Sequence, residues 1–310
     1  MPDSVAMSVP APAPSATIGS TLRDYLALTK PTICLLVLIT GAAGLVWQGE
    51  FTSRPVDFLL VMLGLFLTAG SANALNQYIE RDRDKLMKRT AKRRPLPMGR
   101  IAPLSALIFA TAIGVVGTLL FALVYNVFSA LLALSTILFY AFFYTMYLKP
   151  RTAQNIVIGG AAGAMGPVIA WAAVTGVEGM TWVPWAMFAI IFLWTPPHFW
   201  ALALCLQDDY KANPLPMMPN VAGEASTLRQ MLVYTIALLG VSLSLVWADA
   251  GMIYLLGAVI FGGLFLWKSI LSLVRQERGQ YWGMFGFSIV YLFGLFIAMM
   301  VDVAWRIPVL

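Results

Sequence analysis

Nine uninterrupted apolar stretches constrain the fold of this 310-residue chain more than any other feature. Each is about 20 residues long, the length of an α-helix that crosses the hydrocarbon core of a bilayer. A membrane barrel would instead show short segments of alternating character, so helices are the expected spanning elements. The expected spans are residues 31–48, 57–79, 103–124, 127–147, 155–175, 183–206, 230–248, 251–273 and 283–303. The sequence predicts an all-α polytopic membrane protein, with nine transmembrane helices around a central cavity and a cytoplasmic cap.

The composition agrees with a membrane protein, since 60% of the residues are hydrophobic and only 11% are charged. The bases are unevenly distributed. With a cytoplasmic N-terminus and nine spans, only Arg54 and Arg306 of the 20 lysines and arginines fall outside the cytoplasmic segments. This bias predicts a cytoplasmic N-terminus and a C-terminus on the other side of the membrane. It accounts for the net charge of +6 without nucleic-acid binding, and the basic face would contact anionic membrane lipid.

The start of the chain differs from the rest. Residues 1–20 are rich in Pro, Ala and Ser and lack the basic region and apolar core of a signal peptide. They are expected to form a disordered cytoplasmic leader, and residues 21–310 a single nine-helix domain. Cys34 and Cys205 each lie in an apolar span, which favours buried free thiols over a disulfide or a metal pair.

An acidic motif follows the second apolar span. At about 100° per residue, Asn76, Glu80 and Asp84 fall on one stripe of a helix, whereas Asp82 points away from it. Oxygen ligands on one face are typical of a Mg²⁺ site that a substrate diphosphate completes, and the bases within residues 85–100 would neutralise the phosphates. The alternative is a solvated helix end, in which the acids pair with bases one turn away. Asp84 is expected to be an exposed helix-end residue.

A second polar group lies at the end of the sixth span. His198, the only histidine of the chain, follows Pro196 and Pro197, which are expected to break the helix and free backbone carbonyls. Asp209 lies eleven residues further along, close to three helical turns, so the two side chains would share a face. Acidic residues at two equivalent cytoplasmic helix ends, Asp84 and Asp209, suggest a pair of motifs that clamp Mg²⁺. The alternative for the histidine is a structural hydrogen bond between helices.

These blocks, in this order, resemble the intramembrane aromatic-prenyltransferase (UbiA-type) superfamily, and the protohaem IX farnesyltransferases (haem O synthases) in particular. The superfamily carries an N-x-x-x-D-x-x-x-D type motif after the second helix and a second Asp motif after the sixth. Glu80 departs from it where Asp is common. Asn213 stands four residues beyond Asp209, which leaves Asp209 as the main acid there, with Asp208 beside it. The matching stretches are residues 28–31, 76–84, 87–90, 94–99, 155–163, 194–200, 209–210 and 216–219.

The resemblance implies that farnesyl diphosphate and haem B react to give haem O and diphosphate, with Mg²⁺ as the cofactor. The implied metal ligands are Asn76, Glu80, Asp84 and Asp209. The implied substrate-binding residues are Lys30, Arg94, Arg151 and Asn155. Asp84, Asp209 and His198 are the expected catalytic residues, and His198 could ligate the haem iron, orient the porphyrin or act as a base. The implied location is a bacterial plasma membrane, and the implied protein partners are a haem A synthase or terminal oxidase assembly proteins.

Two other functions stay open at this point. A polyprenyl transferase acting on a quinone-precursor aromatic acid would use the same diphosphate chemistry, although the block around His198 argues against it. A non-enzymatic polytopic transporter or haem-delivery scaffold would need the charged loops only for topology. The two halves of the sequence show no pair of corresponding broken helices of the kind that is common in secondary transporters.

Overall fold

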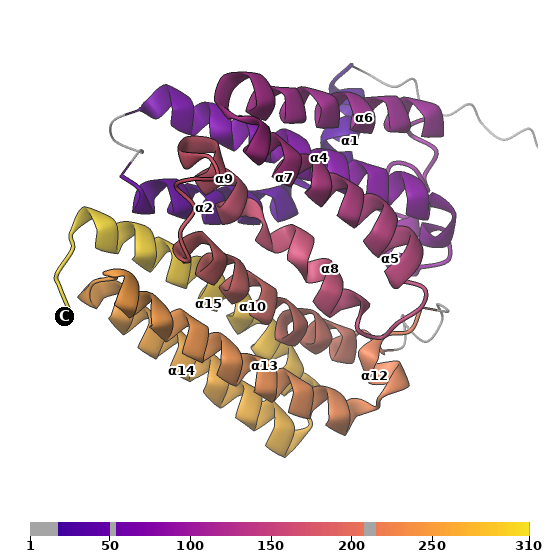
Figure 1. Cartoon of the computed structure of the whole chain (residues 1–310). Coiled ribbons are helices and arrows are strands. Elements are labelled where there is room, and N and C mark those ends of the chain that lie inside the picture. The colour runs from indigo at the N-terminus through magenta and orange to yellow at the C-terminus, as the bar shows by residue number, and fades with distance from the viewer. Residues whose placement is uncertain (1–17, 50–53, 208–214, 310) are drawn as a thin grey trace, which may run out of the picture.

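The computed structural model describes residues 18–49, 54–207 and 215–309. Over these ranges the chain is a bundle of helices without a β-strand (Figure 1). Residues 1–17 of the expected leader lie outside the described ranges, and the chain is helical from Ile18 onward. The predicted all-α class is confirmed.

In the N-terminal half, α1, α2 and α6 pack against the long helix α4. The helices α2, α4 and α6 have proline in their first turn, where the missing N–H costs no hydrogen bond and the fixed φ suits a helix. Glycine allows the close approach of α6 to α4, because a Cβ atom at Gly117 would lie 2.9 Å from the side chain of Thr68. The elements are α1 (Ile18–Thr29), α2 (Pro31–Trp47), α4 (Pro55–Asp84), α5 (Lys88–Ala91), α6 (Pro103–Leu120), the π-helix η1 (Phe121–Tyr125), α7 (Val127–Leu138) and the π-helix η2 (Phe139–Leu148).

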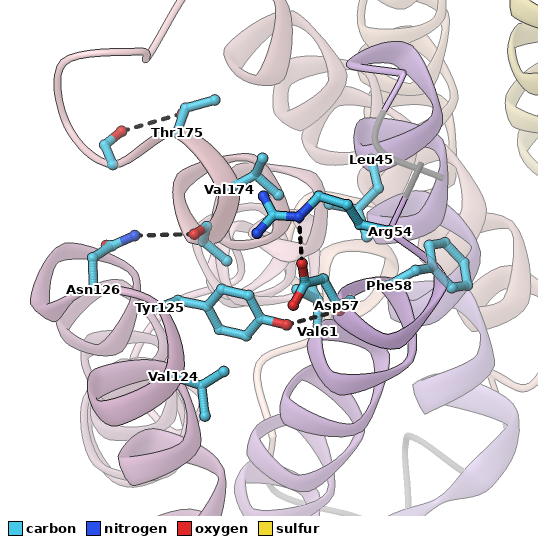
Figure 2. Close-up of a pocket in the computed structure, with 12 residues that line it drawn as sticks. Leu45, Arg54, Asp57, Phe58, Val61, Val124, Tyr125, Asn126, Val174 and Thr175 are labelled. Atoms are coloured by element: carbon cyan, nitrogen blue, oxygen red, sulfur yellow. Dashed lines mark hydrogen bonds and ion pairs between the residues drawn. The ribbon is translucent and has the colours of Figure 1, made fainter. Parts of the chain in front are cut away.

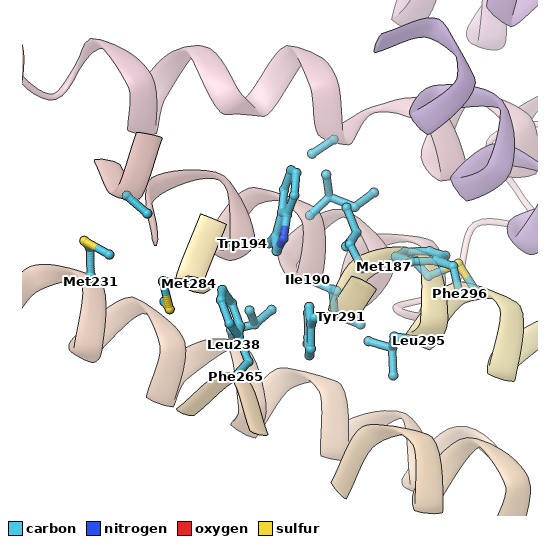
Figure 3. Packing of buried hydrophobic residues seen from close by; sticks show 14 of the residues in the cluster. Met187, Ile190, Trp194, Met231, Leu238, Phe265, Met284, Tyr291, Leu295 and Phe296 are labelled. Atoms are coloured by element: carbon cyan, nitrogen blue, oxygen red, sulfur yellow. The ribbon is translucent and has the colours of Figure 1, made fainter. Parts of the chain in front are cut away.

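In the described part of the chain, the largest of three apolar clusters lies mainly in the C-terminal half, and Figure 3 shows part of its packing. Trp194 of α10, Phe265 of α14 and Tyr291 of α15 pack there with Leu238 of α13. Lipid chains are as apolar as these side chains, so close packing holds the helices together in a bilayer. The elements are α8 (Asn155–Ala164), α9 (Gly166–Thr175), α10 (Val183–Cys205), α12 (Met218–Val221), α13 (Glu224–Ser244), the 3₁₀-helix η3 (Leu245–Ala248), α14 (Met252–Arg275) and α15 (Arg278–Ala304).

Each predicted span coincides with helix. In the described part of the chain, eight helical segments are long and apolar enough to cross a membrane, and a ninth span results if the bent pair α1 and α2 is counted as one. One difference bears on the site: α4 continues beyond the expected end at residue 79 to Asp84. The acidic motif therefore belongs to the spanning helix itself. Such a set of helices makes this a multi-pass membrane protein.

Lys30 separates α1 from α2 in a left-handed conformation, with φ 52° and a bend of 55° between the helices. This conformation is unfavourable for a lysine. Gln77 of α4 supports it, because its Nε2 atom donates hydrogen bonds to the carbonyl oxygens of Ala27 and Leu28, both at 3.0 Å. These carbonyls belong to the last turn of α1, which has no helical partners for them. The break therefore holds Lys30 beside α4.

The expectation that Pro196 and Pro197 break the sixth span is wrong. The helix α10 runs without interruption from Val183 to Cys205, with both prolines in its interior. The prolines remove two backbone donors, but α8, α13 and α15 pack around this stretch and hold it. Thr195 adds a hydrogen bond from its hydroxyl to the carbonyl oxygen of Ile191 at 2.8 Å.

Exposed tryptophans lie at both ends of the bundle. Trp182 precedes α10, Trp247 lies in η3 and Trp305 follows α15, all at the end that carries the C-terminus. Trp282 lies near the start of α15, at the opposite end. Tryptophan prefers the two interfaces of a membrane. Figure 1 shows α5 and α12 together at the end opposite the C-terminus, and the acidic motif of α4 lies at this same end, since α5 follows it directly.

Candidate functional site

The predicted stripe on α4 is present and buried. Asn76, Glu80 and Asp84 are each at most 5% exposed. Asp82 points away from them, as expected, and its exposed carboxylate pairs with Lys85 at 3.0 Å. The expectation that Asp84 is an exposed helix-end residue is wrong, because the loop after α4 folds back over it. Thr90 fixes this loop through a hydrogen bond from its hydroxyl to the carbonyl oxygen of Asp84 at 2.7 Å.

Three bases from three different segments meet the stripe. Lys30 donates a hydrogen bond from Nζ to Oδ1 of Asn76 at 2.8 Å. Lys149 forms an ion pair with Glu80. Arg94 pairs with Asp84 and also lies 3.7 Å from a carboxylate oxygen of Glu80. Three basic side chains therefore surround two carboxylates in a largely buried site.

The π-helix η2 positions one side of this charge cluster, which we define as Lys30, Asn76, Glu80, Asp84, Arg94 and Lys149. Its last residues place Lys149 against Glu80, and its fully buried Thr145 accepts a hydrogen bond from Nδ2 of Asn76 at 3.1 Å. Such wide turns are rare and occur frequently at functional sites. Gly159 of α8 makes room for them, since a Cβ atom there would lie 2.3 Å from the ring of Tyr144.

Lys149 is a site residue that the sequence pattern did not single out. The reason is geometric, because the phase of an α-helix does not apply along η2, where the backbone bonds run from i to i+5. The available signal was its place beside Arg151, in the short basic loop that follows the fourth span. The predicted residues Lys30, Asn76, Glu80, Asp84 and Arg94 all meet in the charge cluster.

Two other predicted substrate-binding residues lie apart from these contacts. Arg151 donates to the carbonyl oxygens of Met146 and Tyr147 at 3.3 and 3.0 Å, and its guanidinium lies 4.4 Å from the ring centre of Tyr147. Asn155 is buried and donates from Nδ2 to the carbonyl oxygens of Thr152 and Pro216, at 2.6 and 3.3 Å. It therefore ties the start of α8 to the segment before α12. Their roles as substrate ligands stay predictions.

The donor set of the charge cluster fits a divalent metal ion. A single guanidinium nitrogen of Arg94 contacts the carboxylates of both Glu80 and Asp84, so the two groups converge on one position. With the amide oxygen of Asn76, they offer the hard oxygen ligands that Mg²⁺ prefers. Within residues 18–49, 54–207 and 215–309, no group of three or more His, Cys, Asp or Glu residues has the geometry of a metal site. The predicted fourth ligand Asp209, and its neighbour Asp208, lie outside the described residues.

His198 of α10 faces α15, and its contacts in the described part of the chain are with residues of these two helices. Its ring stacks between those of Trp194 and Phe285, with centroid distances of 4.2 and 4.8 Å. Its Nδ1 atom lies 2.6 Å from Oγ of Ser288. These contacts include a hydrogen bond between helices, which is the structural role that the sequence left open for this residue. They do not involve the other ring nitrogen, Nε2.

A cavity of about 380 Å³ lies at the opposite end of the bundle from the acidic motif, between the ends of α2 and α9 and the start of α4 (Figure 2). Its polar groups are engaged with one another. Arg54 pairs with Asp57 at 2.7 Å, and Tyr125 donates to the carbonyl oxygen of Asp57 at 2.8 Å. Asn126 donates to the carbonyl oxygen of Ala172 at 2.8 Å. This cavity is separate from the charge cluster.

Comparison with known proteins shows which family the chain is similar to. The family model of the UbiA prenyltransferase family matches residues 37–304. A protein of Gloeobacter violaceus named protoheme IX farnesyltransferase is 47% identical over 288 residues, which cover 92% of this chain and 93% of that protein. The alignment thus extends over nearly the whole of both chains.

Solved structures share the fold at low sequence identity. A digeranylgeranylglyceryl phosphate synthase superposes with a TM-score of 0.76 and 19% identity, over 91% of this chain and 98% of that one. A UbiA homologue from Archaeoglobus fulgidus bound to DMAPP and Mg²⁺ gives a TM-score of 0.65 and 17% identity, over 92% and 100% of the two chains. The family match over most of the chain and these likenesses lead to one conclusion: the chain belongs to the UbiA prenyltransferase family.

Proposed function

We propose that this prenyltransferase transfers the farnesyl group of farnesyl diphosphate to a vinyl side chain of haem B and gives haem O and diphosphate. The charge cluster is the observation that carries the diphosphate half of this proposal. The acceptor is supported by the similarity to the Gloeobacter violaceus protein named protoheme IX farnesyltransferase, at 47% identity over most of both chains. In the reaction, the bond between farnesyl C1 and oxygen breaks, the vinyl group attacks C1, and water adds to the resulting cation as a hydroxyl group with loss of a proton.

The bases of the cluster would bind the diphosphate. Lys30, Arg94 and Lys149 come from three separate segments and converge on one stripe. A diphosphate in their midst would accept charge-assisted hydrogen bonds from all three, which are stronger than neutral ones. Such bonds strengthen as negative charge develops on the leaving group, and this lowers the barrier to breaking the C1–O bond. Arg151 would join them only after leaving its own carbonyl partners.

The oxygen ligands of the cluster would bind Mg²⁺. Asn76, Glu80 and Asp84 fit this role by their position on one stripe, and Asp209 would complete the set. The homologue from Archaeoglobus fulgidus was solved with Mg²⁺ together with a prenyl diphosphate. When bound, the metal ion would supply positive charge that stabilises the leaving diphosphate.

The aromatic residues of η2 would protect the allylic cation from water. The rings of Tyr140 and Tyr144 are stacked, with 5.1 Å between their centroids. Tyr140 lies one π-helical turn before Thr145, and Tyr144 one turn before Lys149. Aromatic faces attract a cation and exclude solvent from it. His198 lies on α10. We assign it to the binding of the haem acceptor rather than to the binding of the diphosphate. Both substrates are apolar over most of their surface, so they would enter from the lipid with their charged groups toward the end that carries α5.

The membrane orientation belongs to the same proposal. The distribution of bases favours a cytoplasmic N-terminus, a C-terminus on the outer side and a bacterial plasma membrane. The charge cluster would then open to the cytoplasm, where water-soluble diphosphate can leave. A haem A synthase or a terminal oxidase assembly protein would be the kind of partner that receives the product.

One assay separates this function from its alternatives. Purified protein is incubated with labelled farnesyl diphosphate and Mg²⁺, with either haem B or a quinone-precursor aromatic acid as acceptor. We expect labelled haem O from haem B and no product from the aromatic acid. Product from the aromatic acid alone would identify a quinone-pathway enzyme. Haem binding without any transfer, in protein that still binds a farnesyl diphosphate analogue, would instead indicate a haem-delivery scaffold.

A further inference from the structure

Ser288 makes two hydrogen bonds that together determine which nitrogen of His198 carries the proton. Its Oγ atom lies 2.6 Å from Nδ1 of His198 and 2.6 Å from the carbonyl oxygen of Phe285. A serine hydroxyl has one proton to donate. The carbonyl of Phe285 can only accept, so the serine proton is used there. Nδ1 of His198 must then donate to Oγ, and the neutral ring keeps its lone pair on Nε2.

The ring cannot easily leave this arrangement. It is stacked on Trp194 at 4.2 Å, with 19° between the planes, and on Phe285 at 4.8 Å, with 27° between the planes. Trp194 also donates from Nε1 to the backbone oxygen of Ser288 at 2.7 Å. Trp194 therefore bonds to the backbone oxygen of Ser288, and His198 bonds to its hydroxyl oxygen. The two stacked rings and the hydrogen bond to Ser288 fix the rotamer of the imidazole.

The Nε2 edge of the ring stays accessible. His198 is 8% exposed, and in the described part of the chain no hydrogen bond to its Nε2 is found. Among the described residues, the fully covered side-chain polar atoms without a partner belong to Gln77, Thr118, Trp200, Ser269 and Ser272. Since Nε2 is not one of them, the exposed surface of the residue includes this atom. A lone pair on an accessible Nε2 is a ligand for iron or an acceptor for a proton.

We propose that Ser288 is a positioning residue that keeps Nδ1 of His198 protonated, so that Nε2 presents its lone pair to the iron of the haem acceptor. This inference rests on the proposed function for the identity of the acceptor, but not for the tautomer. A metal-binding histidine almost always donates its second N–H to a neighbouring acceptor, which fixes the tautomer and raises the basicity of the ligating nitrogen. Ser288 supplies this acceptor from a different helix, α15, so the packing of α10 on α15 becomes part of the acceptor site.

The single histidine of the chain makes a direct test available. Protein labelled with ¹⁵N only in histidine gives one imidazole, whose two nitrogens show which is protonated. Without substrates, we expect a protonated Nδ1 and an unprotonated Nε2. In Ser288→Ala the protonated nitrogen loses its acceptor, and the tautomer should shift toward protonated Nε2, the form that a solvated neutral histidine side chain prefers. A protonated Nε2 in the unaltered protein, or an unchanged tautomer in Ser288→Ala, would overturn the proposal.

Haem binding provides the second measurement. Addition of haem B to the unaltered protein should strongly broaden the Nε2 signal, and Ser288→Ala should bind haem B about tenfold more weakly or worse in an absorbance titration. Ser288→Thr keeps the hydroxyl and should restore both results. Ser242→Ala is the matched control, because it removes another fully buried serine hydroxyl of the same half, bonded to Leu238 and Tyr291. An equal loss of haem affinity in Ser242→Ala would show that Ser288 contributes only to packing and would contradict its positioning role. Failure of the farnesyl transfer assay with the tautomer as expected would contradict the function and not the hydrogen-bond arrangement.

Discussion

The ammonium group of Lys149 forms an ion pair with the carboxylate of Glu80. The proposed phosphate-binding base is therefore paired with a proposed metal-binding acid. Arg94 and Asp84 form a second pair of the same kind. Each carboxylate must release its base before it can bind a metal ion, and each base must leave its carboxylate to bind a phosphate. Binding of the two ligands should therefore be mutually favourable, because each frees the partners of the other.

Lys149→Met tests this coupling. Removal of the base should strengthen the binding of Mg²⁺ alone by about tenfold, because a buried repulsion is lost, and should weaken the binding of diphosphate by a similar factor. Isothermal titration with each ligand separately, and with both together, measures the effect. Lys85→Met is the matched control, since Lys85 is exposed and pairs with Asp82. Weaker binding of both ligands in Lys149→Met would show that the lysine only supports the fold.

The acids of the two motifs should be essential for turnover. Asp84→Ala and Asp209→Ala should each lower the rate at least about a hundredfold, because the loss of a metal ligand costs several kcal/mol of leaving-group stabilisation. Asp82→Ala should be mild. Product formation at saturating Mg²⁺ measures all three, with correct membrane insertion as the control. Asp84 is buried and paired, so Asp84→Asn is the better variant if Asp84→Ala loses its fold. A near-normal rate in the variants at either motif would rule out a two-motif clamp.

His198→Ala should separate the two substrates. His198 stacks on the aromatic rings of Trp194 and Phe285, and we assign it to the haem acceptor. The variant should therefore lose the conversion of haem B and show an altered spectrum of bound haem. The affinity for a farnesyl diphosphate analogue should stay within a few fold. Loss of analogue binding in a folded variant would place the histidine in the diphosphate site, and an unchanged haem spectrum with normal conversion would leave it a structural role.

The distribution of charges predicts the topology. A reporter fused after Leu310 should be found on the periplasmic side, and a tag inserted between residues 89 and 93 on the cytoplasmic side. Accessibility to a membrane-impermeant reagent in intact cells measures both. A cytoplasmic C-terminus would mean that one of the nine spans does not cross the membrane.

Asp302 should be important for stability rather than chemistry. It is fully buried and accepts hydrogen bonds from the backbone N–H groups of Gly251 and Tyr254, at 2.7 and 3.1 Å, at the start of α14. Asp302→Ala should lower the free energy of unfolding by about 2–4 kcal/mol, because two buried donors lose their acceptor. Unfolding in detergent measures the loss, and Asp302→Asn should lose less. The control is Glu178→Ala, in an exposed loop at the same end.

The sequence predicted the helices well because a span needs only length and apolarity. It predicted the stripe of Asn76, Glu80 and Asp84 because these lie on a regular α-helix. It failed where geometry departs from that rule. Lys149 follows a π-helix, the prolines of α10 are tolerated by packing that a single helix does not reveal, and Asp84 is covered by a loop whose fold depends on Thr90. The partner of His198 could not be predicted either, since Ser288 is ninety residues away.

The wide turns of η2 determine how the charge cluster is presented as much as its charged residues do. A π-helix accommodates more residues per turn than an α-helix, so the same residues wound as α-helical turns would rotate Thr145 and Lys149 away from Asn76 and Glu80. Deletion of a single residue between Phe139 and Thr145 that returned this segment to α-helical turns would instead leave Thr145 and Lys149 close to their present orientation. Related chains could thus differ by one residue within η2 and still present the same contacts to the acids of α4.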